Sequence, residues 1–149
     1  MFEQDYLMRM ILQLVAAIRQ SMEKAGGEDH DPAAAAELIE AGIASATELD
    51  GSVLLSLAPG SIASILQVTG TDPHVVEYVG RSLLLESSYL HETGSNDKAD
   101  LRAQQARALA HSYGFDLDET DKPKQMMCNF LERDALSSEK NSSNDGIPS

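Results

Sequence analysis

The sequence has little of what extracellular and membrane proteins use for stability and placement. Cys128 is its one cysteine, so no disulfide can form within the chain. No apolar run approaches the roughly 20 residues of a membrane-spanning helix, and Glu3 and Asp5 stand where a signal peptide carries basic residues. These absences predict a cytoplasmic protein with neither a signal peptide nor a membrane span. The apolar neighbours of Cys128 predict a buried structural thiol.

Basic residues are also scarce. Lysine and arginine number 11 against 24 aspartates and glutamates, a formal net charge of −13. Nucleic acids and anionic membranes bind clustered positive charge, so we expect neither as a partner. Residues 28–72, the acidic segment, contain no lysine or arginine. This segment is either a solubilising surface or a negative face that steers a basic partner. Its acidic residues are Glu28, Asp29, Asp31, Glu37, Glu40, Glu48, Asp50 and Asp72.

Aromatic residues make up only 5% of the chain, and no stretch alternates with the period of two that strands require. Alanine and leucine dominate instead, and both favour helix. Two Asp-Pro pairs, Asp31-Pro32 and Asp72-Pro73, are typical of helix starts, with the aspartate as cap and the proline as first residue. The sequence therefore predicts an all-α array of about six or seven helices. They are expected at 2–24, 32–43, 46–57 with a break at Gly51, 60–68, 73–93 and 96–113, with a last short helix that starts at Pro123.

The first predicted helix has the most regular apolar pattern. Its apolar residues recur at spacings of three and four, which places them on one face and predicts that Leu14 and Ile18 are buried. They are Leu7, Met10, Ile11, Leu14, Val15, Ile18 and Met22. This helix is about twice as long as those between Pro32 and Val68. We therefore expect that these helices do not cover the apolar residues at its start. Phe2, Tyr6 and Met10, with Met8 beside them, then form an exposed apolar patch, and such patches usually mark interfaces. A second copy of the chain is one expected partner, as a homodimer.

The stretch from Pro73 to Gly114 resembles a tetratricopeptide-type antiparallel helical hairpin. Small residues stand where the two helices would approach closely, and a glycine stands at the turn. Ser87 departs from the usual glycine or alanine, and Ala103 is smaller than the customary aromatic residue. The residues that carry the resemblance are Leu83, Ser87, Leu90, Gly94, Ala99, Ala103 and Ala106.

The opening string Phe2-Glu3-Gln4-Asp5-Tyr6-Leu7-Met8-Arg9-Met10-Ile11 is similar to the start of an uncharacterised family of small bacterial cytoplasmic proteins. Members of that family begin with a Phe-Glu-Gln-Asp-Tyr-x-Met-Arg-like helix and carry a tetratricopeptide-like hairpin late in the chain. The resemblance implies a helical fold and a bacterial cytoplasmic origin. It implies no activity.

The length and composition indicate a single helical domain over residues 1–136. Beyond it, residues 137–149 are mostly serine, asparagine, aspartate and glycine, with Ile147 almost alone as an apolar residue. So little apolar surface cannot offset the entropy of ordering the chain. We expect a disordered tail there.

The motifs of catalysis and phosphate binding are missing from the sequence, so no catalytic, cofactor-binding or metal-binding residue is assigned and no cofactor is expected. We therefore expect a non-catalytic helical module that binds a protein partner. The alternative is a small helical metal-binding protein or enzyme that uses His30, in the sequence Glu28-Asp29-His30-Asp31, with its neighbouring carboxylates.

Overall fold

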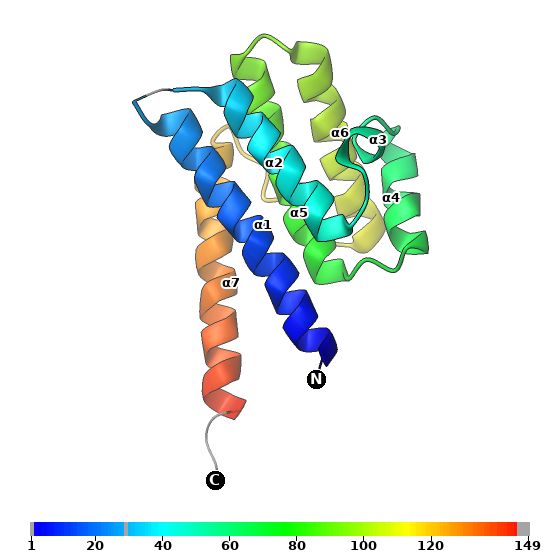
Figure 1. Cartoon of the computed structure of the whole chain (residues 1–149), viewed down its shortest axis with the longest axis vertical. Helices are drawn as coiled ribbons and strands as arrows, with labels where there is room; N and C mark the ends of the chain where they lie inside the picture. Colours follow the sequence, from blue (N-terminus) through cyan, green and yellow to red (C-terminus); the bar gives the residue numbers. More distant parts are fainter. Residues whose placement is uncertain (1, 29, 146–149) are drawn as a thin grey trace. The chain divides into compact units, whose positions relative to one another are not determined.

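The computed structural model describes residues 2–28 and 30–145, with side chains for residues 5–28 and 30–135. These residues form seven helices and no strand, which confirms the predicted all-α array (Figure 1). The helices are α1 (Phe2–Gly26), α2 (Pro32–Thr47), α3 (Gly51–Leu54), α4 (Pro59–Val68), α5 (Pro73–Glu92), α6 (Asn96–Tyr113) and α7 (Pro123–Asp145). None of the helices in the described part of the chain is long and apolar enough to cross a membrane.

The chain divides into two compact units. Met1–Leu117 holds α1 to α6, and Asp118–Ser149 holds α7. The boundary lies inside the predicted single domain, residues 1–136, at an acidic linker that has few apolar side chains to bury. The predicted tail, 137–149, lies beyond the described side chains. Its backbone is helical as far as Asp145, and residues 146–149 are outside the described residues.

The two Asp-Pro pairs start helices as predicted. The Asp31 carboxylate accepts a hydrogen bond from the Ala34 amide at 3.0 Å, and the Asp72 carboxylate accepts one from the His74 amide at 2.8 Å. Each bond satisfies an amide that the first helical turn leaves without a partner.

The predicted helix at 46–57 is wrong. Residues as far as Thr47 belong to α2, which ends because Glu48 adopts a left-handed conformation with φ of 58°. Asp50 then caps a separate short helix, α3, through the amides of Ser52 and Val53. The sequence placed a break at Gly51, where α3 begins, but missed the end of α2, because that end depends on the backbone conformation of Glu48 rather than on apolar spacing.

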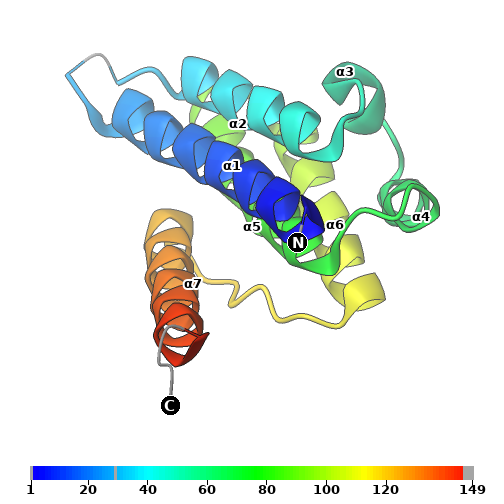
Figure 2. The ribbon, with the colours of Figure 1, turned by 60° about the horizontal axis from the view of Figure 1, so that its bottom comes forward.

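The core of the first unit lies where α5 packs against α1, α2 and α6. Leu14 and Ile18 are 1% and 0% exposed, which confirms that this face of α1 is buried. α1 and α2 run side by side (Figure 2). They approach closely at Gly42, where an added Cβ would lie 2.6 Å from the Ala17 Cβ. Any larger residue at Gly42 would therefore push the two helices apart.

The antiparallel hairpin predicted for the second half is formed by α5 and α6 (Figure 1). Gly94 makes the turn in a left-handed conformation, with φ of 83°. The two helices also share a buried hydrogen bond, which the Ser87 hydroxyl donates to the Ala99 carbonyl at 2.7 Å. The specific likeness to a tetratricopeptide repeat stays a prediction.

Cys128 is exposed, so the predicted buried thiol is wrong. The buried residues of α7 follow a helical stripe made of Met126, Met127, Phe130 and Leu131. Cys128 lies off this stripe, because two residues beyond Met126 the helix has turned by about 200°. Local composition predicted the wrong side for this residue because it ignores the helical period.

Candidate interaction groove

A groove runs beside the N-terminal half of α1, within the first unit. We call it the α1 groove. Its other walls are the end of α2 and the segment that joins α4 to α5, and its volume is about 780 Å³. The residues that line it are Tyr6, Leu7, Met10, Ala46, Thr47, Glu48, Leu49, Thr69, Gly70, Thr71, Asp72 and Val75.

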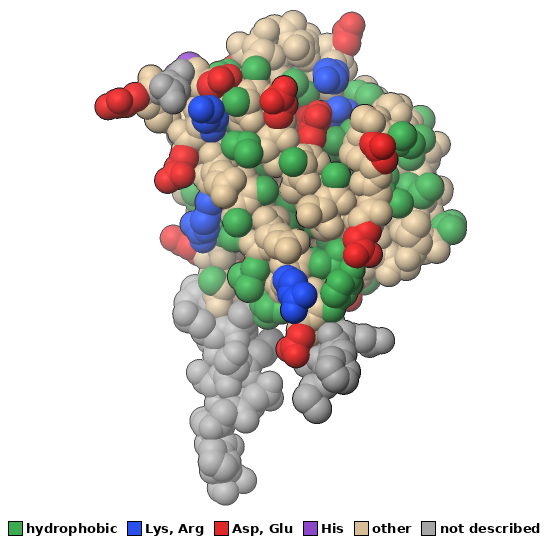
Figure 3. Space-filling view, in the orientation of Figure 1, with side chains coloured by type: hydrophobic (Ala, Val, Ile, Leu, Met, Phe, Trp, Pro, Cys, Tyr) green, Lys and Arg blue, Asp and Glu red, His purple; other side chains and the backbone are tan. Residues whose placement is uncertain are grey.

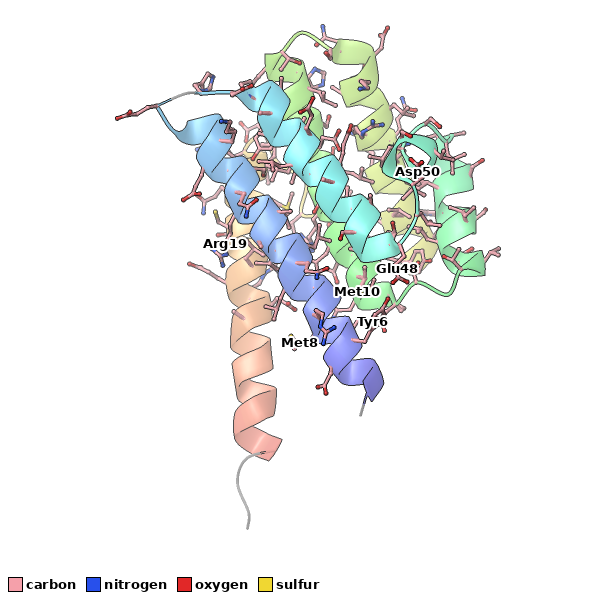
Figure 4. All side chains as sticks on the ribbon, viewed as in Figure 1. Tyr6, Met8, Met10, Arg19, Glu48 and Asp50 are labelled. Atoms are coloured by element: carbon pink, nitrogen blue, oxygen red, sulfur yellow. The ribbon has the colours of Figure 1, made fainter. Side chains whose placement is uncertain are left out.

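The groove contains two of the three residues predicted to form an interface. Tyr6 and Met10 are one helical turn apart and point toward the end of α2, where Glu48 lies (Figure 4). Tyr6 is 47% exposed. Met8 is equally exposed but lies on the other side of α1, and the side chain of Phe2 falls outside the described residues. The predicted patch is therefore split between two sides of α1. Tyr6 and Met10 face the groove, whereas Met8 does not.

Tyr6 is held at the rim of the groove by Glu48. The tyrosine hydroxyl donates a hydrogen bond to the Glu48 carboxylate, 42 residues away in sequence. This bond, and to a smaller degree desolvation, raises the pKa of Tyr6 above its ordinary value. The hydrogen bond links the N-terminal half of α1 to the end of α2 at the rim of the groove.

The charged groups that line the groove, as far as side chains are described, are both acidic: Glu48 and Asp72. The C-terminal ends of α2 and α4 add to this, since each helix C-terminus carries about half a negative charge. The positive N-terminal end of α5 is offset by its own cap, Asp72. Figure 3 shows this face, where hydrophobic side chains lie exposed over α1 and the end of α2. Arg9 is exposed on α1 but does not line the groove.

The alternative site at His30 shows no metal-binding geometry among the described residues. His30 is exposed, and its Nδ1 lies 2.6 Å from the Ala25 carbonyl oxygen, in the loop that follows α1. The described part of the chain contains no group of three His, Cys, Asp or Glu residues placed to hold a metal ion. The neighbouring Asp29 lies outside the described residues.

A buried polar cluster was not predicted from the sequence. Arg102 of α6 is buried and donates to the Glu86 carboxyl of α5 at 3.0 Å and to the Glu40 carboxyl of α2 at 3.1 Å. It also donates to the Leu55 carbonyl at 2.8 Å. Gln105 adds bonds to the carbonyls of Leu55 and Leu57 at 3.0 and 2.8 Å. The cluster thereby ties the segment after α3 to the hairpin.

The pKa values of the two carboxyl groups in this cluster are shifted in opposite directions. Burial, followed by the hydrogen bond with Glu40, raises the pKa of Glu86 well above its ordinary value, against the attraction of Arg102. Partial burial also raises the pKa of Glu40, but hydrogen bonds from Glu86 and Arg102 outweigh it and leave that pKa lowered. The Glu86 Oε1 atom accepts no hydrogen bond from the described residues.

This cluster is structural rather than a binding site. Glu86 is 0% exposed and Arg102 is 4% exposed, so a solute cannot reach them. The bonds described for Arg102 and Gln105 are to protein groups. The one signal in the sequence was a glutamate that directly follows three consecutive leucines, Leu83 to Leu85, on a helix with little exposed surface.

Comparisons with known proteins offer no function to carry over. No family model, no curated protein and no solved structure matches this chain. The case for function therefore depends on the geometry of the chain's own residues.

Proposed function

We propose that this protein is a non-catalytic helical module that binds a protein partner through the α1 groove. The observation that carries the proposal is the exposure of Tyr6, together with the half-buried Leu7 and Met10, in an open groove beside α1. Exposed apolar groups that are contiguous and rimmed by polar residues usually mark protein interfaces. Glu48 and Asp72 supply that polar rim.

A helical partner surface suits the groove's side chains. Tyr6 offers a large ring with a polar tip, a combination that is enriched at interfaces. Met10 has a flexible, unbranched side chain that adapts to different apolar partners.

We place this binding in the bacterial cytoplasm, in keeping with the single cysteine and with the family that the N-terminal string resembles.

The test is site-specific photo-crosslinking in the cell from which the chain derives. Replacing Tyr6 with the photoreactive amino acid benzoylphenylalanine keeps an aromatic ring in the groove. The control places the same amino acid at Gln104, which is exposed on α6 and far from the groove in sequence.

We expect a protein adduct from position 6 and none from position 104. An adduct of twice the chain's mass would identify a second copy as the occupant, and any other mass would identify a different protein. No adduct from position 6, or equal adducts from both positions, would overturn the proposal.

A further inference from the structure

We propose that the occupant of the α1 groove is a basic amphipathic helix of another protein. In this arrangement a lysine or arginine of the partner contacts Glu48, and its apolar residues contact Tyr6 and Met10. The inference rests on the proposed function and adds the chemistry of the partner.

The first support is the charge of the groove. Glu48 and Asp72 line it, and among the described side chains no lysine or arginine does. The C-terminal ends of α2 and α4 add partial negative charge to the same opening. A basic partner is attracted to such a surface and an acidic one is repelled, so the groove selects by charge as well as by shape.

The second support is the apolar floor. Leu7 and Met10 of α1, Leu49 after α2 and Val75 of α5 come from three places in the chain and are less exposed than the acidic Glu48 and Asp72. Val75 is only 2% exposed, whereas Tyr6 at the rim is 47% exposed. A partner therefore needs apolar residues toward the floor and positive residues toward the rim, which is the pattern of an amphipathic helix.

The secondary structure of the walls favours a helix over an extended strand. A peptide that binds as a strand needs an unpaired sheet edge, and the described residues contain no strand. The walls are helices and helix ends, which is the setting in which an amphipathic helix lays its apolar face into a groove.

The charge also argues against a second copy of this chain. Each copy carries a net charge of −13, so two copies repel. Within α1, Arg9, Arg19 and Lys24 are matched in number by three acidic residues, Glu3, Asp5 and Glu23. The helix thus has no surplus of positive charge to offer to the groove of a neighbour.

The test is a selection from random 16-residue peptides displayed on phage. Peptides that bind the wild-type protein are retained, and those that also bind the Tyr6→Ser variant are removed. This variant deletes the ring without changing the charge. The remaining peptides are then measured for affinity against Glu48→Gln and against the matched control Glu37→Gln. Glu37 is exposed in the same acidic segment but does not line the groove.

We expect the Tyr6-dependent peptides to be enriched in lysine and arginine between helically spaced apolar residues. Their affinity should fall about fivefold for Glu48→Gln, as for the loss of one exposed ion pair, and stay unchanged for Glu37→Gln. Tyr6-dependent peptides with no excess of basic residues would overturn this inference and leave the proposed function standing. A selection that yields no Tyr6-dependent peptide would overturn the inference. The crosslinking experiment then decides independently whether the proposed function also fails.

Discussion

Two regions of the first unit reverse the usual distribution of side chains. In the interior, where α5, α6 and α2 meet, the ionisable residues Arg102 and Glu86 are buried. At the surface, along the N-terminal half of α1, the apolar residues Tyr6 and Met8 are each 47% exposed. The first region places charge where apolar residues are expected, and the second does the opposite.

The two regions differ in whether their side chains find suitable partners within the chain. Buried charge is costly unless it is paired and hydrogen-bonded. Arg102 meets that condition through two carboxyl groups and the Leu55 carbonyl. Exposed apolar side chains need to be covered rather than paired, and Tyr6 in the α1 groove is left 47% exposed by the described residues. The interior cluster is thus satisfied within the chain, whereas the α1 groove would be covered only by the partner that we propose.

A second buried arginine supports this account of the interior. Arg81 of α5 is 3% exposed and donates to the carbonyls of Asp116 and Leu117 at 2.7 and 3.2 Å. It also pairs with Glu77 at 3.0 Å. Like Arg102, it ties an irregular segment to a helix. Buried arginines in this protein therefore hold the loops that follow α3 and α6.

The largest effect is expected from breaking the interior cluster. Arg102→Leu would leave Glu86, Glu40 and the Leu55 carbonyl with fewer partners inside the protein, and it should cost about 3–5 kcal/mol of unfolding free energy. The control is Arg133→Leu, because Arg133 pairs with Asp118 at 2.9 Å on the surface. That change should cost less than about 1 kcal/mol. Urea unfolding of both variants would measure the difference, and equal losses would refute a special role for the cluster.

A somewhat smaller effect is expected from the buried face of α1. Leu14→Ala and Ile18→Ala should each cost about 2–5 kcal/mol, because each leaves a cavity in a packed core. Leu12 is 59% exposed, so Leu12→Ala is the matched control and should cost less than about 0.5 kcal/mol. Chemical unfolding of the three variants checks this. Losses under 1 kcal/mol at both Leu14 and Ile18 would mean that this face is not core.

A pH-dependent effect is expected from Glu86. Its pKa lies well above the ordinary value of 4.5, so the folded protein holds a proton that the unfolded chain releases. As the pH rises above 4.5, this carboxyl therefore subtracts stability until the pH reaches its raised pKa. Glu86→Gln mimics the protonated form and does not titrate. Its unfolding free energy relative to the wild type should rise with pH, by at most about 1.4 kcal/mol per pH unit. Unfolding curves between pH 4.5 and 8 would show this, and a difference independent of pH would contradict it.

The sequence predicted what depends on apolar period and on caps. The spacing of Leu14 and Ile18 identified the buried face of α1. The length of α1 drew attention to Tyr6 and Met10, which line the α1 groove. The rest depends on tertiary contacts. Glu40 and Arg102 are 62 residues apart, and a charged residue on a helix is by default assigned to the surface.

The groove itself could not be predicted from the sequence for the same reason, because it too depends on tertiary contacts. Its walls come from α1, the end of α2 and the segment before α5, and the bond between Tyr6 and Glu48 spans 42 residues. The excess of acid in residues 28–72 was visible, but the sequence could not show that Glu48 and Asp72 from that segment face one opening.

The most direct test measures folding and binding together on Tyr6→Ser. If the ring serves a partner rather than the fold, the melting temperature should stay within about 2 °C of the wild type. On the same sample, affinity for the selected basic peptides should fall at least tenfold. Unchanged peptide affinity, or a melting temperature that falls markedly, would contradict the claim that the α1 groove is a docking site.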